Sequence, residues 1–173
     1  ATPAEQAQLL WLYRADRRKI EIIPPGVNTA HFQNAMPPHE AGELLGLNPK
    51  SKMLLFVGRI EPLKAIDTIF EALYVMREKS PKLLRNLRFT IVGGDLTDTK
   101  DNEMQRLQDM SVEFGIDHMV CFVGAKEQSQ LPIYYSAATA VIMPSDYESF
   151  GMVALEAMAT GTPVIASQVG GLA

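Results

Sequence analysis

The sequence predicts a doubly wound α/β domain, in which helices cover both faces of a parallel sheet. Short apolar runs that end at glycine or proline alternate with longer segments whose apolar residues recur at helical spacing. The runs show no polar alternation, which is typical of strands buried on both faces of a parallel sheet. A length of 173 residues suits one domain, and strand–helix alternation with right-handed crossovers gives this architecture.

Six apolar runs are expected to form the strands. Most of them end at or just before a glycine or proline, residues that interrupt regular structure. In chain order the runs are residues 20–24, 53–57, 89–92, 119–123, 139–143 and 163–166.

Helices are expected between these runs. Residues 66–76 and 104–114 carry apolar stripes at helical spacing, which we interpret as core faces. Gly115 follows the second stripe at a position typical of a helix C-terminus. Further helices are expected over residues 1–19, 128–137 and 152–159.

The chain is expected to have two unequal parts. Pro24-Pro25-Gly26 and Met36-Pro37-Pro38 bracket a linker, which predicts a boundary near Asn34. Residues 1–33 would then be an interdomain helix and strand, at the edge of a domain that is missing here. Residues 34–173 would form the main domain, truncated at its C-terminus because another helix is expected to begin near Gly170.

Composition excludes several classes of function. A net charge of −4 argues against sequence-independent binding of nucleic acid, which requires a basic surface. The three histidines and Cys121 show no metal-ligand spacing, and Cys121 is expected to be a buried thiol. No apolar stretch approaches the roughly 20 residues of a membrane span, and no signal peptide opens the chain. A cytoplasmic protein is therefore expected.

The candidate ligand site lies where the strands end. In doubly wound sheets, ligands bind beyond the carboxyl ends of the strands. Gly58-Arg59, Gly93-Gly94-Asp95, Gly124-Ala125-Lys126 and residues 144–151 all follow predicted strands directly. We therefore expect these four segments to meet at one edge of the sheet.

The segment from Glu148 to Glu156 combines a helix N-terminus with two carboxylates. Free backbone N–H groups from about Phe150 to Val153 form a site for an anion, and Gly151 permits a close approach to the backbone. Glu156 lies about one turn into the helix, and helical side chains lean toward the N-terminus. Such a site suits a ligand with both phosphates and vicinal hydroxyls. Spacing alone leaves open that Glu148 caps the helix and that Glu156 is a surface residue.

The segment from Gly58 to Lys64 carries two cations between a strand and a helix. Arg59 and Lys64 could clamp a diphosphate, the arginine through two hydrogen bonds and the lysine as a point charge. The alternative is two solvated cations, one of which is paired with Glu61.

Together these segments resemble the retaining glycosyltransferases of GT-B family 4, the group 1 glycosyltransferases. The resemblance covers nearly the whole chain in the family's order, and the E-x7-E segment with the following G-x-P-V-I-A strand is its most specific part. The matching segments are residues 23–28, 56–59 with Lys64, 91–94, 120–124, 144–145, 148–156 and 161–166.

The resemblance implies a Rossmann-like fold, the C-terminal half of a GT-B enzyme, and a role for each matching residue. Arg59 and Lys64 would hold and stabilise the donor diphosphate, and Glu148 would contact the donor sugar. The catalytic residues would thus be Glu148, Arg59 and Lys64. Further donor-binding residues would be Gly26 near the phosphate, Lys126 and Leu131 near the base, Ser149, Phe150, Gly151, Met152 and Val153 at the helix N-terminus, and Glu156 at the ribose.

The same resemblance implies an activity. The donor would be a UDP-, GDP- or ADP-sugar, with no cofactor and no metal. The full-length enzyme would transfer a hexosyl group with retention of configuration, by front-face attack with the leaving phosphate as base. The acceptor, a sugar or a glycolipid, would bind mostly to the missing N-terminal domain, so the isolated chain would be inactive. The resemblance also allows peripheral association of the full-length enzyme with a membrane.

One residue departs from the family pattern. A glycine usually follows the lysine, whereas Ala65 stands here. If this position adopts a positive φ, alanine costs about 1 kcal/mol. If it is the first helical residue, alanine is harmless or better.

Rival functions differ in their motifs. A dinucleotide oxidoreductase requires G-x-G-x-x-G and a P-loop NTPase requires G-x-x-x-x-G-K-[ST], and neither occurs. A phosphorylase would require a pyridoxal lysine, which nothing singles out. A sugar-nucleotide-binding module and a GT-B-type sugar-nucleotide epimerase remain alternatives.

Overall fold

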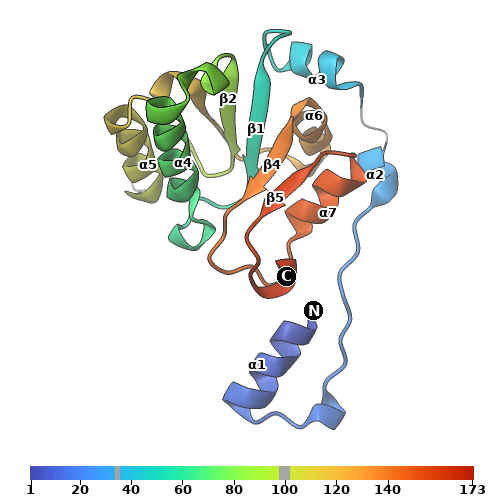
Figure 1. The fold of residues 1–173 in the computed structure, drawn as a ribbon. Helices are drawn as coiled ribbons and strands as arrows, with labels where there is room; N and C mark the ends of the chain where they lie inside the picture. The colour runs from blue at the N-terminus through green and yellow to red at the C-terminus, as the bar shows by residue number, and fades with distance from the viewer. Residues whose placement is uncertain (34–35, 98–101) are drawn as a thin grey trace.

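The structure, a computed structural model, describes residues 1–33, 36–97 and 102–173 (Figure 1). Within these residues the chain forms a parallel five-stranded sheet in the order β3-β2-β1-β4-β5. The expected boundary at Asn34 lies outside the described residues. The strands are β1 (Lys52–Val57), β2 (Leu87–Val92), β3 (Val120–Gly124), β4 (Ala140–Met143) and β5 (Val164–Ala166).

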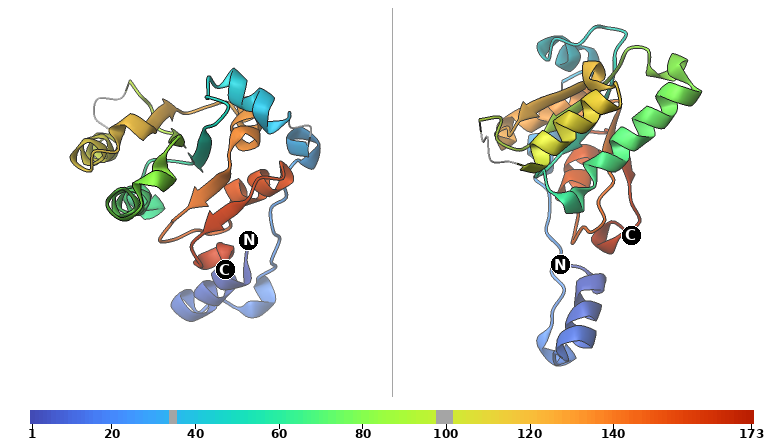
Figure 2. Two further views of the ribbon diagram at one scale, coloured as in Figure 1. Left: turned by 45° about the horizontal axis from the view of Figure 1, so that its top comes forward. Right: turned by 90° about the vertical axis from the view of Figure 1, so that its left-hand side faces the viewer.

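Helices cover both faces of the sheet (Figure 2), so the predicted doubly wound fold is confirmed. One face carries α4 (Ile66–Lys79) and α5 (Asn102–Glu113). The other face carries α2 (Thr29–Gln33), α3 (Pro38–Leu44), α6 (Leu131–Ala137) and α7 (Met152–Ala159).

Each face has its own apolar core. Phe56 of β1 packs with α4 and α5, whereas its neighbour Leu55 packs with α6 and α7. In β2, Ile91 and Val92 divide in the same way. Successive strand residues point to opposite faces, so a strand between two helical layers is apolar at consecutive positions.

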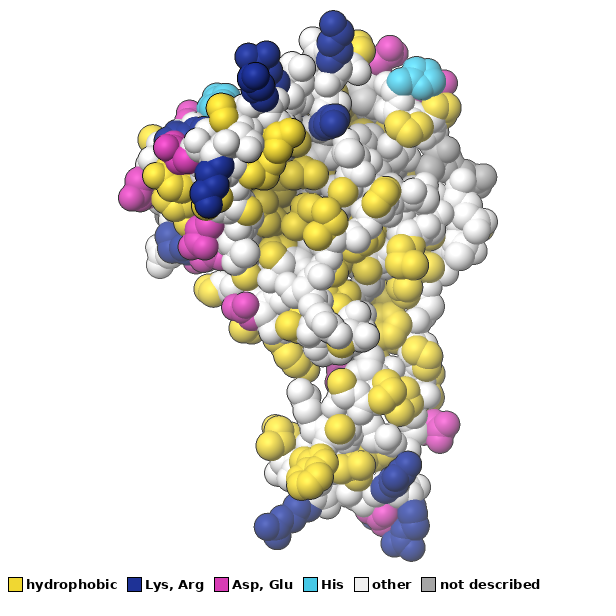
Figure 3. Space-filling view, in the orientation of Figure 1, with side chains coloured by type: hydrophobic (Ala, Val, Ile, Leu, Met, Phe, Trp, Pro, Cys, Tyr) yellow, Lys and Arg dark blue, Asp and Glu magenta, His cyan; other side chains and the backbone are white. Residues whose placement is uncertain are grey.

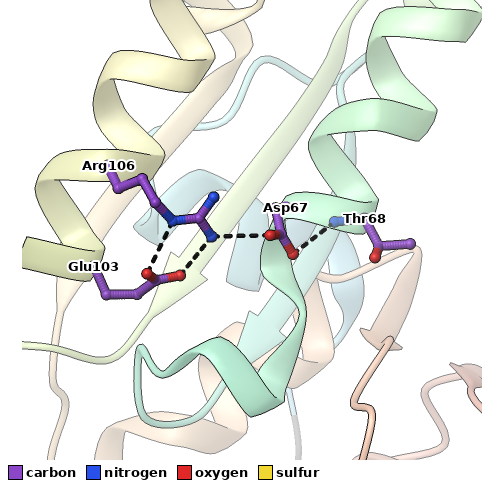
Figure 4. Close-up of polar contacts among 4 residues, drawn as sticks. All are labelled: Asp67, Thr68, Glu103 and Arg106. Carbon is purple, nitrogen blue, oxygen red and sulfur yellow. Dashed lines mark hydrogen bonds and ion pairs between the residues drawn. The ribbon is translucent and has the colours of Figure 1, made fainter.

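An arginine links the two helices of the first face (Figure 4). Arg106 on α5 binds Glu103 one turn earlier through two hydrogen bonds of 2.7 and 2.9 Å, and it binds Asp67 on α4 at 2.9 Å. These carboxylates raise the pKa of Arg106 above its ordinary value, the hydrogen bonds to Glu103 contributing most. The contact sets the position of α5 beside the first turn of α4.

The N-terminal region differs from the prediction. Residues 20–24 form no strand: they pair with neither of the edge strands, β3 and β5. The expected helix over residues 1–19 is divided into α1 (Pro3–Tyr13) and a 3-10 turn, η1 (Arg17–Lys19). Arg14 ends α1 in the left-handed region at φ 52°, and the Asp16 side chain caps the turn by accepting from the Arg18 backbone N–H.

Two further expectations are only partly met. Cys121 is half-buried rather than buried, because β3 lies at the edge of the sheet. The helix expected near Gly170 is a single 3-10 turn, η6 (Gly170–Leu172).

Candidate functional site at the carboxyl ends of the strands

Two adjacent cavities lie beyond the carboxyl ends of the strands. The first, about 290 Å³, is lined by residues that follow β1 and β4 and by the start of α7. The second, about 280 Å³, is lined by residues that follow β1, β2 and β3. Val57, Gly58 and Arg59 line both cavities, so the two lie side by side.

The first cavity contains most of the residues selected from the sequence. Its wall includes Arg59 and Lys64 from the segment after β1. It also includes the run Glu148, Ser149, Phe150, Gly151, Met152 and Val153. The second cavity contains Lys126 and Leu131. Gly26 and Glu156 line neither of the two cavities, and Gly26 lies in the extended segment before α2.

The first cavity faces the N-terminus of α7. Gly151 precedes this helix at φ 89°, and no described side chain caps it. The first hydrogen bonds of the helix run from Ala154 and Leu155 to the Gly151 carbonyl. The preceding backbone N–H groups can therefore bind an anion, with the positive end of the helix dipole behind them.

Lys64 and Glu148 form an ion pair in this cavity. Lys64 Nζ lies 2.7 Å from Glu148 Oε2, and the two side chains are 19% and 15% exposed. Glu148 therefore does not cap the helix, and Lys64 is not a solvated cation. A second contact between the same loops, from the Asp146 N–H to the Leu63 carbonyl at 3.0 Å, holds the lysine near the carboxylate.

Arg59 is the solvated cation paired with Glu61 that the sequence left open as an alternative. Its Nη1 donates to Glu61 Oε1 at 2.6 Å, and its side chain is 78% exposed. An exposed pair of this kind is worth about 0–1 kcal/mol. Arg59 can therefore exchange Glu61 for a ligand phosphate at little cost.

A pair of glycines supports the loop that carries Glu148. The Gly171 N–H donates to the Glu148 carbonyl at 2.8 Å. A Cβ on Gly171 would lie 2.7 Å from Phe150 Cα and closer still to the Ser149 carbonyl oxygen. In the sequence, Gly170-Gly171 indicates the start of a helix, although paired glycines are also a signal of close backbone approach.

Glu156 is buried, so it is not the surface residue that spacing left open. Tyr135 on α6 donates its hydroxyl to Glu156 Oε2 at 2.6 Å. Burial first, and then the hydrogen bond to this carboxylate, raise the pKa of Tyr135 above its ordinary value. Sequence reasoning missed Tyr135, because its distance of 21 positions from Glu156 carries no helical or strand period.

We expect Tyr135→Phe to lower the free energy of unfolding by about 1.5–3 kcal/mol at neutral pH, because Glu156 loses a charge-assisted hydrogen bond. A tyrosine whose pKa is raised by folding contributes stability that is complete below its ordinary pKa of about 10 and is lost at higher pH. Urea unfolding should therefore show the wild-type stability falling more steeply above about pH 10 than that of the variant. Exposed Tyr147→Phe is the matched control, and equal slopes in Tyr135→Phe and wild type would contradict the assignment.

Ala65 adopts the first of its two expected conformations. It precedes α4 at φ 48° and ψ 43°, in the left-handed region. The departure from glycine therefore costs about 1 kcal/mol of backbone strain. It leaves the adjacent Lys64 in contact with Glu148.

The described part of the chain lacks two features, a cluster of metal ligands and a membrane-spanning helix. It contains no group of three or more His, Cys, Asp or Glu side chains that could hold a metal ion. None of its helices combines the length and apolarity needed to cross a membrane.

Comparison with known proteins agrees with this geometry. The family described as "Glycosyl transferases group 1" matches residues 41–173. The D-inositol 3-phosphate glycosyltransferase of Frankia alni is 39% identical over 99% of this chain and 42% of its own length. The chain thus spans about 40% of the length of such curated relatives.

Solved structures share the fold. Sucrose-phosphate synthase from Thermosynechococcus elongatus is 36% identical, with a TM-score of 0.83 over 99% of this chain and 40% of the other. Anabaena Alr3699/HepE, solved in complex with UDP and glucose, is 23% identical, with a TM-score of 0.78 over 97% of this chain and 44% of the other. The chain, with its doubly wound sheet and its two cavities beyond the strand ends, belongs to the group 1 glycosyltransferase family.

Proposed function

We propose that this chain binds the nucleotide-sugar donor of a retaining hexosyltransferase that requires no metal. The observation that carries the proposal is the first cavity, in which the N-terminus of α7, Lys64 and Glu148 lie together. Anabaena Alr3699/HepE, which has the same fold, was solved in complex with UDP and glucose, and this supports the class of ligand.

The two cavities together provide a separate place for each part of such a donor. The diphosphate would lie at the N-terminus of α7, where Lys64 and Arg59 neutralise its charge. Glu148 would accept hydrogen bonds from the sugar hydroxyls, because it faces the same cavity. The nucleoside would extend into the second cavity, beside Lys126 and Leu131.

The proposed reaction uses the same groups. The acceptor oxygen bonds to the anomeric carbon on the face from which the diphosphate leaves, and the acceptor proton passes to the departing phosphate oxygen. Configuration is therefore retained. Arg59, Lys64 and the helix N-terminus stabilise the charge that develops on the diphosphate. The acceptor, a sugar or a glycolipid, would be held by a part of the longer enzyme outside this chain.

Calorimetric titration with UDP, GDP, ADP and their sugars tests donor binding. We expect saturable binding of one nucleoside diphosphate and no glycosyl transfer by the chain alone. A folded chain that binds none of them at millimolar concentration would refute the proposal. A Kd of 1 mM corresponds to a binding free energy of only about −4 kcal/mol. A binding module and an epimerase would also bind the donor, so product analysis of the longer enzyme separates them from a transferase.

We expect EDTA to leave nucleotide affinity nearly unchanged. Lys64, Arg59 and the N–H groups at the start of α7 can neutralise the diphosphate without a cation. The titration is repeated with EDTA and with added Mg²⁺. A tenfold loss of affinity in EDTA, about 1.4 kcal/mol, would show that a metal ion carries the phosphates instead.

We expect Glu156→Gln to weaken the binding of ribonucleotides more than the binding of their 2′,3′-dideoxy analogues. Oε2 of Glu156 accepts from Tyr135, and we assign the remaining carboxylate oxygen to the ribose hydroxyls. Because Glu156 is buried and lines neither cavity, this assignment rests on the resemblance of residues 148–156 to the family pattern. Affinities of wild type and variant for a ribonucleotide and its 2′,3′-dideoxy analogue form a double-mutant cycle. Coupling below about 0.3–0.5 kcal/mol, the usual additivity error, would exclude the ribose assignment.

A further inference from the structure

A concentration of positive charge lies in the segment 77–88. These residues include five lysines or arginines and one acid, Glu78, although the chain as a whole carries a net charge of −4. The segment comprises the end of α4, a 3-10 turn (η3, Pro81–Leu84) and the start of β2. It is therefore a local excess of positive charge, denser than the chain average, as residues 14–19 also are.

The fold places one further cation, Lys52, and one histidine, His118, beside this segment. Lys52, at the start of β1, pairs with Leu87 in the sheet register, and its N–H donates to the Asn86 carbonyl at 2.8 Å. His118 lies in the turn before β3. In Figure 3, dark-blue side chains gather at the top of the molecule, over the region where Figure 1 shows the upper ends of β1 and β2. This is the amino-terminal edge of the sheet, opposite the candidate donor site.

A cavity of about 360 Å³ opens at this edge. Arg77, Arg85 and His118 contribute to its wall, together with the apolar side chains of Leu84, Leu87 and Met119. No aspartate or glutamate is among the residues that line it. Neither Glu78 nor exposed Asp117, the acids next to Arg77 and His118 in the sequence, belongs to the wall.

The two arginines differ in what they can offer. Arg77 is held in place: it donates to the Phe114 carbonyl, binds Glu78 at 2.9 Å and lies 5.3 Å from the centre of the Tyr74 ring. Arg85 is exposed, and it has no ion-pair partner among the residues that the structure describes. Arg85 is therefore the guanidinium available to a ligand, beside an Arg77 whose charge is already paired with Glu78.

We propose that this edge of the sheet is a second anion site, which takes the phosphate group of a phosphate ester. A guanidinium binds phosphate oxygens through two parallel hydrogen bonds, and a cation without an ion-pair partner in a hollow raises the local concentration of anions. The apolar wall accommodates the carbon part of the ester. Exposed Leu83, at 65%, lies beside the cavity in the η3 turn. The phosphate could thus belong to a soluble ester or to a lipid headgroup, and the experiment separates these sources.

The test is an NMR titration with inorganic phosphate up to about 10 mM. Resolved amide signals distinguish this edge (Asn86, Leu87 and His118) from the donor site (Gly58 and Gly151), so the result does not depend on the proposed function. We expect saturable shifts at the edge, and at least tenfold weaker binding in Arg85→Gln. Lys19→Gln, which removes an exposed cation from η1, is the charge-matched control and should bind as the wild type does.

Vesicles identify the source of the phosphate. Sedimentation with phosphatidylglycerol vesicles, but not with phosphatidylcholine, together with loss of binding in Arg85→Gln, would support a lipid headgroup. Shifts with inorganic phosphate and no sedimentation would support a soluble ester. The proposal is overturned if neither ligand binds at this edge, or if Lys19→Gln weakens binding as much as Arg85→Gln.

Discussion

Replacement of Gly171 by alanine is expected to remove nucleotide-diphosphate binding almost completely. The new Cβ would overlap the Ser149 carbonyl oxygen and lie 2.7 Å from Phe150 Cα. Both contacts are with backbone, so a side-chain rotation cannot relieve them, and the loop from Glu148 to Gly151 must move. Displacement of about 1 Å is enough to impair a preorganised site by a hundredfold.

The same substitution should also lower the free energy of unfolding, by about 1–3 kcal/mol, as overpacking does. Gly42→Ala is the matched control: its new Cβ would make only ordinary contacts, 3.8 Å from Leu47, and its φ is outside the left-handed region. Gly42 lies in α3 and lines neither cavity of the candidate site. Urea unfolding and calorimetry are compared for the two variants. Wild-type affinity in a folded Gly171→Ala variant would show that η6 does not position the donor loop.

Replacement of Lys64 by methionine should weaken nucleotide-diphosphate binding by about a hundredfold or more, near 3 kcal/mol. The ligand loses a cation, and Glu148, whose partner at 2.7 Å is removed, then repels the phosphates. Arg59→Ala should cost less, roughly 1.5–3 kcal/mol, because Arg59 is exposed and supplies only its own charge-assisted contact. Added salt should narrow the gap between wild type and Arg59→Ala, because salt screens exposed charges.

A double variant separates stability from binding. Lys64→Met with Glu148→Gln removes the unpaired carboxylate, so it should recover much of the stability that Lys64→Met loses, because an unpaired half-buried charge is more costly than a neutral pair. It should not recover the affinity for the diphosphate. If the double variant binds the nucleotide as the wild type does, Lys64 does not hold the phosphates.

Local physics explains which parts of the fold could be predicted. The apolar runs of β1, β2 and β4 are set by burial and lie within one or two residues of the expected positions, and α4 begins at the first residue of its predicted stripe. The run at residues 20–24 has the same local character, but it forms no strand. A strand requires a neighbour, and whether a neighbour exists is a property of the whole sheet.

The same distinction between local and long-range information applies to the candidate site. The sequence by itself determined which residues follow the strands, and therefore placed Arg59, Lys64, Lys126 and the segment from Glu148 at one edge, because parallel strands share a carboxyl end. It also determined where α7 begins, because Gly151 precedes an apolar helical run.

Only the tertiary structure decided the partners of these groups. Lys64 meets Glu148 across 84 positions, Tyr135 meets Glu156 across 21, and Gly171 touches the backbone at Ser149 and Phe150. The same is true of Arg77, Arg85 and His118, which three separate elements bring to one cavity. Periodicity describes the direction of a side chain relative to its own helix or strand. The group that the side chain contacts depends on how the elements pack, because burial of apolar surface drives packing without regard to distance along the chain.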